Sequence, residues 1–213
     1  MATYDLDEQE QLDSLKAWWK RWGSLTMLAL AIVVAAGAGW RYWQNRTLTQ
    51  SLEAASVYQN LTQSLAANDA KGARTAGTML IDKYHDTAYA PRAALLLAKL
   101  NVAGKDLKSA QTQLEWAVSN SKEPAVKDLA RLRLAGVQLD QKQYVDALKT
   151  LSGAHSDAYA FRFLDLKGDV LLAQGKQAEA RAAYQSAFGK MPEDNVYRGI
   201  VELKLDALGG QSK

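Results

Sequence analysis

Residues 161–192 read FRFLDLKGDVLLAQGKQAEARAAYQSAFGKMP, with small residues at the places where two packed helices need them. Gly168 would let the first helix approach the second, Gly175 suits the turn between them, and Ala180 leaves room for a neighbouring helix. Pro192 would end the unit, because proline cannot continue a helix. The stretch therefore predicts a pair of antiparallel helices in about 34 residues.

The preceding sequence repeats this arrangement. Alanines that correspond to Ala180 stand at Ala147, Ala110 and Ala73, so that the successive spacings are 37, 37 and 33 residues. The third copy adds further matches at Ala135, Leu151 and Ala154. A period of this length with small residues at these places is typical of tetratricopeptide repeats, which stack as helical hairpins.

Together the copies predict an all-α fold, a tetratricopeptide-like α-solenoid of about four helical hairpins over residues 47–208. A capping helix near residues 196–208 would cover the last apolar face, as such arrays require. Residues 209–213 would form a flexible C-terminus. The first copy fits least well, because Gly77 stands where a large apolar residue is usual.

A second feature lies near the N-terminus. Residues 22–40 carry no charge between Arg21 and Arg41 and contain the run TMLALAIVVAAGAG. As a helix, these nineteen residues span about 28 Å, close to the thickness of a bilayer's hydrocarbon core. We therefore predict a single transmembrane helix over residues 22–43, preceded by a cytoplasmic amphipathic tail over residues 1–21. Aromatic and basic residues at both edges would anchor the helix at the membrane interfaces: Trp18, Trp19, Trp22, Trp40, Arg41, Tyr42 and Trp43.

Two alternatives compete with a retained membrane anchor. The tripeptide at residues 36–38, Ala-Gly-Ala, resembles the cleavage site of a signal peptide. However, the acidic residues that precede the span do not fit a short basic n-region. A buried core helix would not collect tryptophans at both ends. A retained anchor therefore fits the sequence best.

The orientation of this helix depends on the positive charges beside it. Lys16, Lys20 and Arg21 precede the span, and Arg41 and Arg46 follow it, which weakly favours a cytoplasmic N-terminus. Small residues recur every four positions within the span and would permit close contact with another membrane helix, although they also fit ordinary alanine-rich filler. They are Ala31, Ala35 and Gly39.

Composition argues against catalysis. The 213 residues include no cysteine and only two histidines, His85 and His155, so neither thiolate nor histidine metal sites are indicated. The formal net charge of +3 is too small to indicate a nucleic-acid binder. The sequence matches neither a phosphate loop nor a nucleophile elbow. We therefore expect no enzymatic activity, cofactor, metal or small-molecule substrate.

In a tetratricopeptide stack, the first helix of each hairpin lines a concave groove that binds partners. The repeat register places on this groove Tyr58, Thr62 and Leu65 from the first hairpin, Leu95, Lys99 and Val102 from the second, Leu129, Leu132 and Leu139 from the third, and Arg162, Asp165 and Asp169 from the fourth. The leucines of the third hairpin would suit an amphipathic helix or an extended apolar segment. Alternatively, they belong to the core, which a shift of the register by one residue would bring about.

Four stretches carry a resemblance to a known family: GWRYW at 39–43, LEAASVYQN at 52–60, LARLRLAGVQLDQKQYVDALKTL at 129–151 and LKGDVLLAQGKQAEARAAYQSA at 166–187. The chain resembles the YfgM family of bacterial inner-membrane proteins, which are ancillary subunits of the SecYEG translocon. The resemblance extends over most of the chain. It implies a single-pass protein of the inner membrane with a cytoplasmic N-terminus and a periplasmic repeat domain.

The resemblance also implies the partners. These would be the SecYEG translocon and a membrane-anchored periplasmic chaperone of the prolyl-isomerase type, with unfolded secreted proteins as a further candidate. The expected function is that of a membrane-anchored interaction protein, which raises the local concentration of a chaperone near emerging chains. In a sharper version, the domain itself holds unfolded chains. The alternative function is a cytoplasm-facing scaffold of opposite topology, which recruits a soluble partner through the repeat groove.

Overall fold

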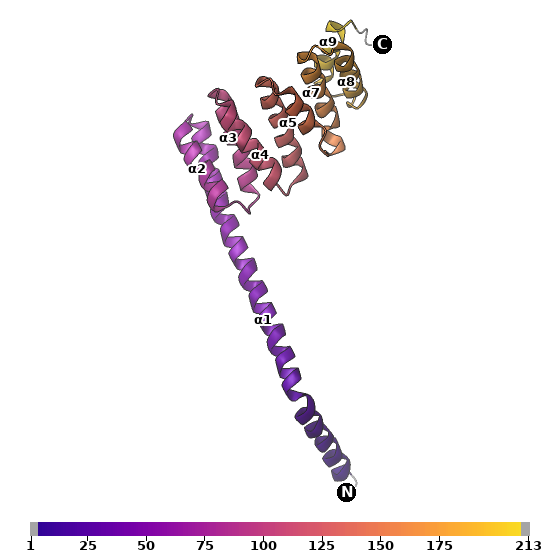
Figure 1. Ribbon diagram of the computed structural model, residues 1–213. Coiled ribbons are helices and arrows are strands. Elements are labelled where there is room, and N and C mark those ends of the chain that lie inside the picture. Colours follow the sequence, from indigo (N-terminus) through magenta and orange to yellow (C-terminus); the bar gives the residue numbers. More distant parts are fainter. Residues whose placement is uncertain (1–3, 210–213) are drawn as a thin grey trace. The chain divides into compact units, whose positions relative to one another are not determined.

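The computed structural model describes the backbone of residues 4–209 and the side chains of residues 10–209, and it contains helices but no strand over that range. The chain divides into two compact units, Met1–Gln50 and Ser51–Lys213 (Figure 1). The helices in chain order are α1 (Tyr4–Ala66), α2 (Ala70–Lys83), α3 (Tyr89–Ala103), α4 (Leu107–Asn120), α5 (Pro124–Asp140), α6 (Tyr144–Leu151), the 3₁₀ turn η1 (Asp157–Tyr159), α7 (Ala160–Ala173), α8 (Gln177–Gly189) and α9 (Arg198–Ala207). Apart from Gly209, the predicted flexible C-terminus lies outside the described residues.

The second unit is a stack of helical hairpins. The first helix of a hairpin is the C-terminal end of α1 in the first hairpin, and α3, α5 and α7 in the other three. Each of these packs against the helix that follows it. Each hairpin also packs against the next, and α9 packs on α8 at the end of the array. The predicted all-α class, with tetratricopeptide-like hairpins and a capping helix, is confirmed.

The turn inside each hairpin has the same backbone geometry four times. One residue of each turn has a positive φ, near 60° in the first three hairpins and 79° in the fourth. Each stands five residues before the anchor alanine of its hairpin. The next residue donates its backbone N–H to a carbonyl near the end of the first helix, at 2.8 to 3.0 Å, which is a Schellman arrangement. The four residues with positive φ are Asn68, Lys105, Lys142 and Gly175.

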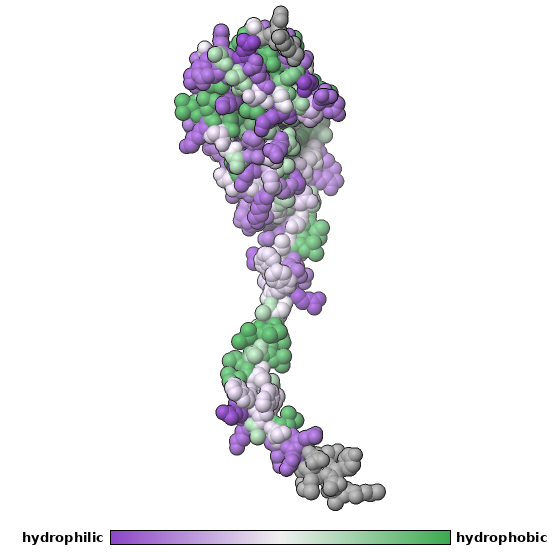
Figure 2. Space-filling view, turned by 90° about the vertical axis from the view of Figure 1, so that its right-hand side faces the viewer, coloured by the Kyte–Doolittle hydropathy of each residue, from purple (hydrophilic) through white to green (hydrophobic). Residues whose placement is uncertain are grey.

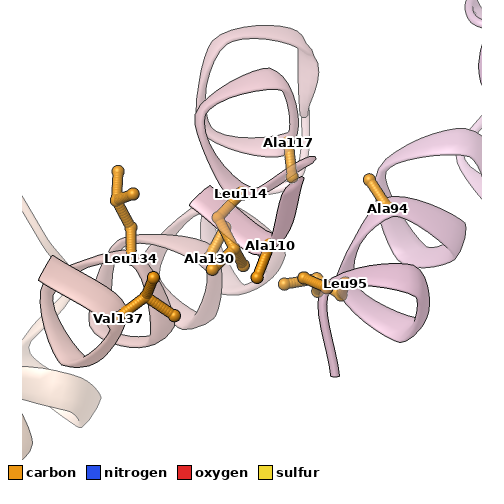
Figure 3. Packing of buried hydrophobic residues seen from close by; sticks show 9 residues of the cluster. Ala94, Leu95, Ala110, Leu114, Ala117, Ala130, Leu134 and Val137 are labelled. Atoms are coloured by element: carbon orange, nitrogen blue, oxygen red, sulfur yellow. The ribbon is translucent and has the colours of Figure 1, made fainter. Parts of the chain in front are cut away.

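Alanines fill the contacts between helices. The four predicted anchors, Ala73, Ala110, Ala147 and Ala180, have no exposed surface. Because a methyl group occupies little space, the helix backbones approach closely and the larger side chains interdigitate around them. Figure 3 shows this packing in the cluster between the second and third hairpins, where Ala110 and Leu114 of α4 lie among residues of α3 and α5.

Two glycines serve the same purpose where even a methyl group is too large. A Cβ at Gly168 of α7 would lie 2.3 Å from the ring of Tyr184 on α8. A Cβ at Gly77 of α2 would lie 2.7 Å from the side chain of Leu97 on α3. Gly77 departs from the usual repeat pattern because Leu97 takes the space of the missing side chain.

The third hairpin is shorter than the repeat pattern predicts. α6 ends at Leu151, and Ala154, which we expected at a packing position, is exposed in the turn that follows. This turn is held by hydrogen bonds to α5 instead. The buried carboxylate of Asp128 accepts from the backbone N–H and the hydroxyl of Ser156 at 3.0 and 2.7 Å, and Arg131 donates to the carbonyl of Ala154. The prediction for Ala154 was wrong because these bonds replace a further turn of helix.

The capping helix α9 is held on α7 by charge as well as by apolar contact. The Nζ atom of Lys204 lies 2.8 Å from Oδ1 of Asp165 and 2.7 Å from Oδ1 of Asp169. The hydroxyl of Tyr184 on α8 donates to Asp169 at 2.7 Å. Val201 of α9 is 1% exposed and covers the apolar end of the stack. The cluster therefore joins the last three helices.

The groups in this cluster change one another's pKa values. Burial raises the pKa of the Asp165 carboxyl, although Lys204 opposes the shift. Burial alone would lower the pKa of Lys204, but its hydrogen bonds to Asp165 and Asp169 outweigh burial and raise this pKa above 10.5. For Asp165, a raised pKa means that ionisation costs stability at neutral pH, and Lys204 offsets that cost. For Lys204, a raised pKa means that the charged ammonium stabilises the folded state fully below pH 10.5, and that this stabilisation is lost as the pH rises through the raised pKa.

The first unit consists of α1 up to residue 50. Of the helices within residues 4–209, α1 is the one that is long and apolar enough to cross a membrane. Its large apolar side chains are exposed, with Leu28 at 59% and Val33 at 67%. α1 is helical through residues 21–47 without a break, so the edges of the membrane segment stay predictions from charge and aromatic residues.

Gly168→Ala should lower the free energy of unfolding by about 2 kcal/mol, because the ring of Tyr184 is fully buried and bonded to Asp169 and cannot move aside easily. Urea denaturation of the full chain in detergent measures this change. Gly189→Ala is the matched control, since a Cβ at the end of α8 meets nothing within 4 Å. Equal losses in the two variants would contradict the close approach of α7 and α8.

Lys204→Met should lower the free energy of unfolding by about 2 kcal/mol at neutral pH, because it leaves two partly buried carboxylates without their cation. The difference from the unsubstituted protein should shrink as the pH rises above 10.5 and through the raised pKa of Lys204. Thermal melts of both proteins between pH 7 and pH 11.5 measure this. A difference that stayed constant up to the highest pH would show that packing alone holds α9.

Candidate partner-binding surface

One position recurs in the first helix of every hairpin. The spacings of 37, 37 and 33 residues connect Thr62, Lys99, Gly136 and Asp169. Thr62 and Lys99 are exposed, and Gly136 and Asp169 are partly exposed. These residues therefore form a row along the candidate surface, in which the sequence analysis identified every member except Gly136.

A hollow of about 390 Å³ lies beside this row, between the second and third hairpins. Its lining is mostly apolar and includes two predicted groove residues. The lining residues are Ala98, Lys99 and Val102 of α3, Leu114 of α4, and Arg133, Gly136, Val137 and Asp140 of α5. The volume lies within the range of about 300–1,000 Å³ that is usual for ligand pockets. It suits one large side chain of a partner better than a whole folded element.

Gly136 opens this hollow at a cost to helix stability. It lies in the interior of α5, where glycine is about 1 kcal/mol less favourable than alanine. Its φ is not positive, and a Cβ there would meet nothing within 4 Å. Neither backbone conformation nor close packing requires a glycine at this position, in contrast to Gly77 and Gly168.

Charged side chains stand around the hollow. Lys99, Arg133 and Asp140 are exposed, and none forms an ion pair within 4 Å among the described residues. The Nη1 atom of Arg133 donates to the carbonyl of Leu95 at 3.3 Å, which holds the guanidinium between α3 and α5. Two cations and one carboxylate give the hollow a small positive excess.

Leu95 is a core residue, and its placement on the groove is corrected. It is 5% exposed and packs with Ala110 and Leu114 in the cluster of Figure 3. It occupies the same repeat position as Tyr58 and Leu132, which also pack against core clusters. Lys99 follows four residues later on the same side of α3, so helical periodicity alone does not separate the buried position from the exposed row.

The other apolar residues predicted for the groove are partly buried. Each packs against a core cluster and retains some exposed surface. They are Tyr58, Leu65, Leu129, Leu132 and Leu139. The alternative that the leucines of the third hairpin belong to the core thus accounts for much of their surface. Val102, at 38% exposed, is the most accessible apolar residue of the predicted set.

The predicted residues of the fourth hairpin contact the cap. Asp165 and Asp169 bind Lys204, as described above. Arg162 is exposed, and its guanidinium lies 4.9 Å from the ring centre of Tyr197, a cation–π distance. A partner at this end of the row would meet side chains that are already paired.

The residues predicted for the membrane lie exposed along α1. Ala31, Ala35 and Gly39 are exposed and open to a neighbour. The predicted interface residues are also exposed: Trp18, Trp19, Trp22, Trp40, Arg41, Tyr42 and Trp43. Rings pair at each edge, with centres 6.1 Å apart for Trp18 and Trp19 and 5.7 Å for Trp40 and Trp43. Figure 2 shows a hydrophobic band on part of α1, whereas the visible face of the second unit is mixed.

The capping helix carries an apolar stripe that the sequence analysis did not identify. Ile200 is 48% exposed and Leu203 is 71% exposed, on the side of α9 away from the buried Val201 and Leu205. Capping elements of repeat arrays usually present a polar outer face. The spacing of these four residues marks the two faces, but periodicity alone does not tell which face is covered.

Histidine and acidic side chains do not cluster in the described part of the chain. Within residues 10–209, no group of three or more His, Cys, Asp or Glu side chains is close enough to hold a metal ion. His85 and His155 lie in the turns after α2 and α6. What the surface offers is apolar contact, hydrogen bonding and charge.

Comparisons with known proteins agree with this architecture. The model of the tetratricopeptide repeat-like domain family matches residues 16–210. An ancillary SecYEG translocon subunit of Neisseria gonorrhoeae is 35% identical over 206 residues, which cover 95% of this chain and 98% of that protein. Proteins of the same name are 29% identical in Haemophilus influenzae, over 96% of this chain and 99% of that protein, and 28% identical in Escherichia coli, over 87% and 89%. The chain therefore belongs to the family of ancillary SecYEG translocon subunits, which have a tetratricopeptide repeat-like domain.

Proposed function

We propose that the protein is a membrane-anchored interaction protein at the SecYEG translocon of the bacterial inner membrane. In this proposal α1 crosses the membrane once, the N-terminus is cytoplasmic, and the repeat domain lies in the periplasm. The domain binds a membrane-anchored chaperone of the prolyl-isomerase type, secreted proteins as they emerge, or both. It acts by binding, without catalysis or a cofactor.

The observation that carries the proposal is the exposed apolar surface of α1. Residues 22–40 are uncharged and helical, and their large side chains have no covering partner within the described residues. Such a helix is stable in hydrocarbon because its backbone groups bond internally and its side chains contact lipid. The relatives named as translocon subunits match nearly the whole chain, including this segment.

The orientation is supported by the flanking charges. Lys16, Lys20 and Arg21 precede the apolar segment, against Arg41 and Arg46 after it, and positive residues favour the cytoplasmic side. The opposite orientation would place the repeats in the cytoplasm and make the protein a scaffold there.

The repeat domain supports a binding role through its hollow and through the charges of Lys99, Arg133 and Asp140, which form no ion pair with another described residue. An anchor that fixes this domain near the translocon would raise the effective concentration of any bound chaperone at the site where chains emerge. The contact of the membrane helix and the contact of the repeat domain can then each be weak, because once one has formed, the other forms within the same complex.

Cysteine labelling should establish the topology, since the chain has no native cysteine. Ser14→Cys and Ser119→Cys place one exposed thiol before and one after the apolar segment. Ser121 is less suitable because it is 5% exposed. In intact spheroplasts, a membrane-impermeant maleimide should label residue 119 and not residue 14. Labelling at residue 14 alone would reverse the orientation and leave the cytoplasmic scaffold.

Purification in mild detergent should test the translocon contact. The chain should bring SecYEG with it, and Ala35→Leu with Gly39→Leu should reduce the recovered SecYEG severalfold if the small residues contact another membrane helix. Ala36→Leu, on a different side of α1, is the control and should have little effect. If both variants recover SecYEG equally, the small residues are not the contact, and if even the unsubstituted chain recovers none, the proposed association fails.

A further inference from the structure

We propose that the hollow over Gly136 is a pocket for one large apolar side chain of a bound peptide segment. The neighbouring residue of that segment carries a carboxylate, which Lys99 and Arg133 bind. This inference rests on the proposed function, because it specifies what the repeat domain recognises in its partner. It selects one place in the array, between α3 and α5, as the point where specificity arises.

The first argument is the shape and chemistry of the hollow. Ala98, Val102, Leu114 and Val137 supply apolar walls, and the space of about 390 Å³ is open to solvent on one side. An apolar side chain that enters it leaves water and contacts these walls, which is the usual source of affinity in such pockets. A polar side chain would find few partners there.

The second argument is Gly136 itself. Gly136 lines the hollow, and apart from its own helix a Cβ at this position would meet nothing within 4 Å, so a larger side chain would take up open space there. The same repeat position carries Thr62, Lys99 and Asp169 in the other hairpins, so the repeat does not demand glycine. The glycine therefore weakens α5 and provides space, and the space lies where a partner's side chain can enter.

The third argument is charge. The cations Lys99 and Arg133 stand at the rim without an ion pair within 4 Å to any side chain of residues 10–209, and the guanidinium of Arg133 is held in place by the carbonyl of Leu95. A guanidinium and an ammonium close together are suited to a carboxylate. Asp140, two helical turns beyond Arg133, can accept a backbone N–H of an extended segment. An acidic residue beside the apolar one thus pairs with the two cations, and a backbone N–H of the same segment serves Asp140.

The test uses the full chain in nanodiscs of phosphatidylcholine, whose neutral surface does not attract charged peptides. Fluorescence anisotropy measures the binding of labelled probe peptides with the central sequences Asp-Phe-Asp, Lys-Phe-Lys and Asp-Ala-Asp between Gly-Ser flanks. The Asp-Phe-Asp probe should bind at least about tenfold more tightly than either of the others, since only this probe offers both the ring and the carboxylate.

Gly136→Leu separates binding from folding. The leucine should fill the hollow and weaken binding of the Asp-Phe-Asp probe at least about tenfold, while the melting temperature stays the same or rises, because leucine favours a helix more than glycine does. Gly189→Leu is the matched control and should leave binding unchanged, since residue 189 is also open to solvent but lies outside the hollow. Lys99→Gln should reduce the preference for Asp-Phe-Asp over Lys-Phe-Lys.

Three results would overturn the inference. These are equal binding of Asp-Phe-Asp and Lys-Phe-Lys, unchanged binding by Gly136→Leu, and no binding of the Asp-Phe-Asp probe at millimolar concentration. SecYEG recovery by the unsubstituted protein distinguishes this failure from failure of the proposed function. If the unsubstituted protein recovers SecYEG but does not bind the Asp-Phe-Asp probe, the inference falls alone. If the unsubstituted protein forms dimers and Gly136→Leu abolishes them, the hollow is occupied by a second copy of the chain and not by a peptide of a partner.

Discussion

The repeat domain depends on backbones that approach one another through alanine. The methyl groups of Ala73, Ala110, Ala147 and Ala180 are fully buried in the core between helices, and a larger side chain at these positions would push the helices apart. A residue with positive φ lies five positions earlier each time, so the turn and the contact are set by one short segment. Because all four hairpins share this segment, their first helices stack in a common register, and the rows of surface residues follow from it.

Glycine has two opposite uses within this arrangement. At Gly77 and Gly168 the missing side chain lets a neighbour occupy the space, so glycine tightens the contact between helices. At Gly136 no neighbour occupies the space, and glycine leaves a hollow. The residue type alone does not distinguish these uses. The surrounding atoms do, and this is why a repeat pattern locates the row but not the pocket within it.

The sequence was sufficient for the fold because its main signals are local and periodic. The small residues at Gly168 and Ala180, and the charge-free segment before the repeats, predict hairpins and an apolar helix without knowledge of distant contacts. Other features depend on contacts between elements. The bonds of Asp128 to the turn after α6 shorten that helix, and the position of Leu95 inside the stack removes it from the surface. The pairing of Asp165 with Lys204 joins residues 39 apart, which no short motif could indicate.

The cap on the array also has a consequence for the order in which the domain can be completed. Synthesis proceeds from the N-terminus, so the hairpins can form one after another while the chain is still growing. α9 follows the other described helices, and until it is made the apolar face of α8 beneath Val201 is exposed and Asp165 and Asp169 lack the cation of Lys204. Growing chains with such open ends are prone to aggregate. The growing repeat domain is therefore most vulnerable just before α9 emerges, and the contact of Lys204 with Asp165 and Asp169 ends that interval.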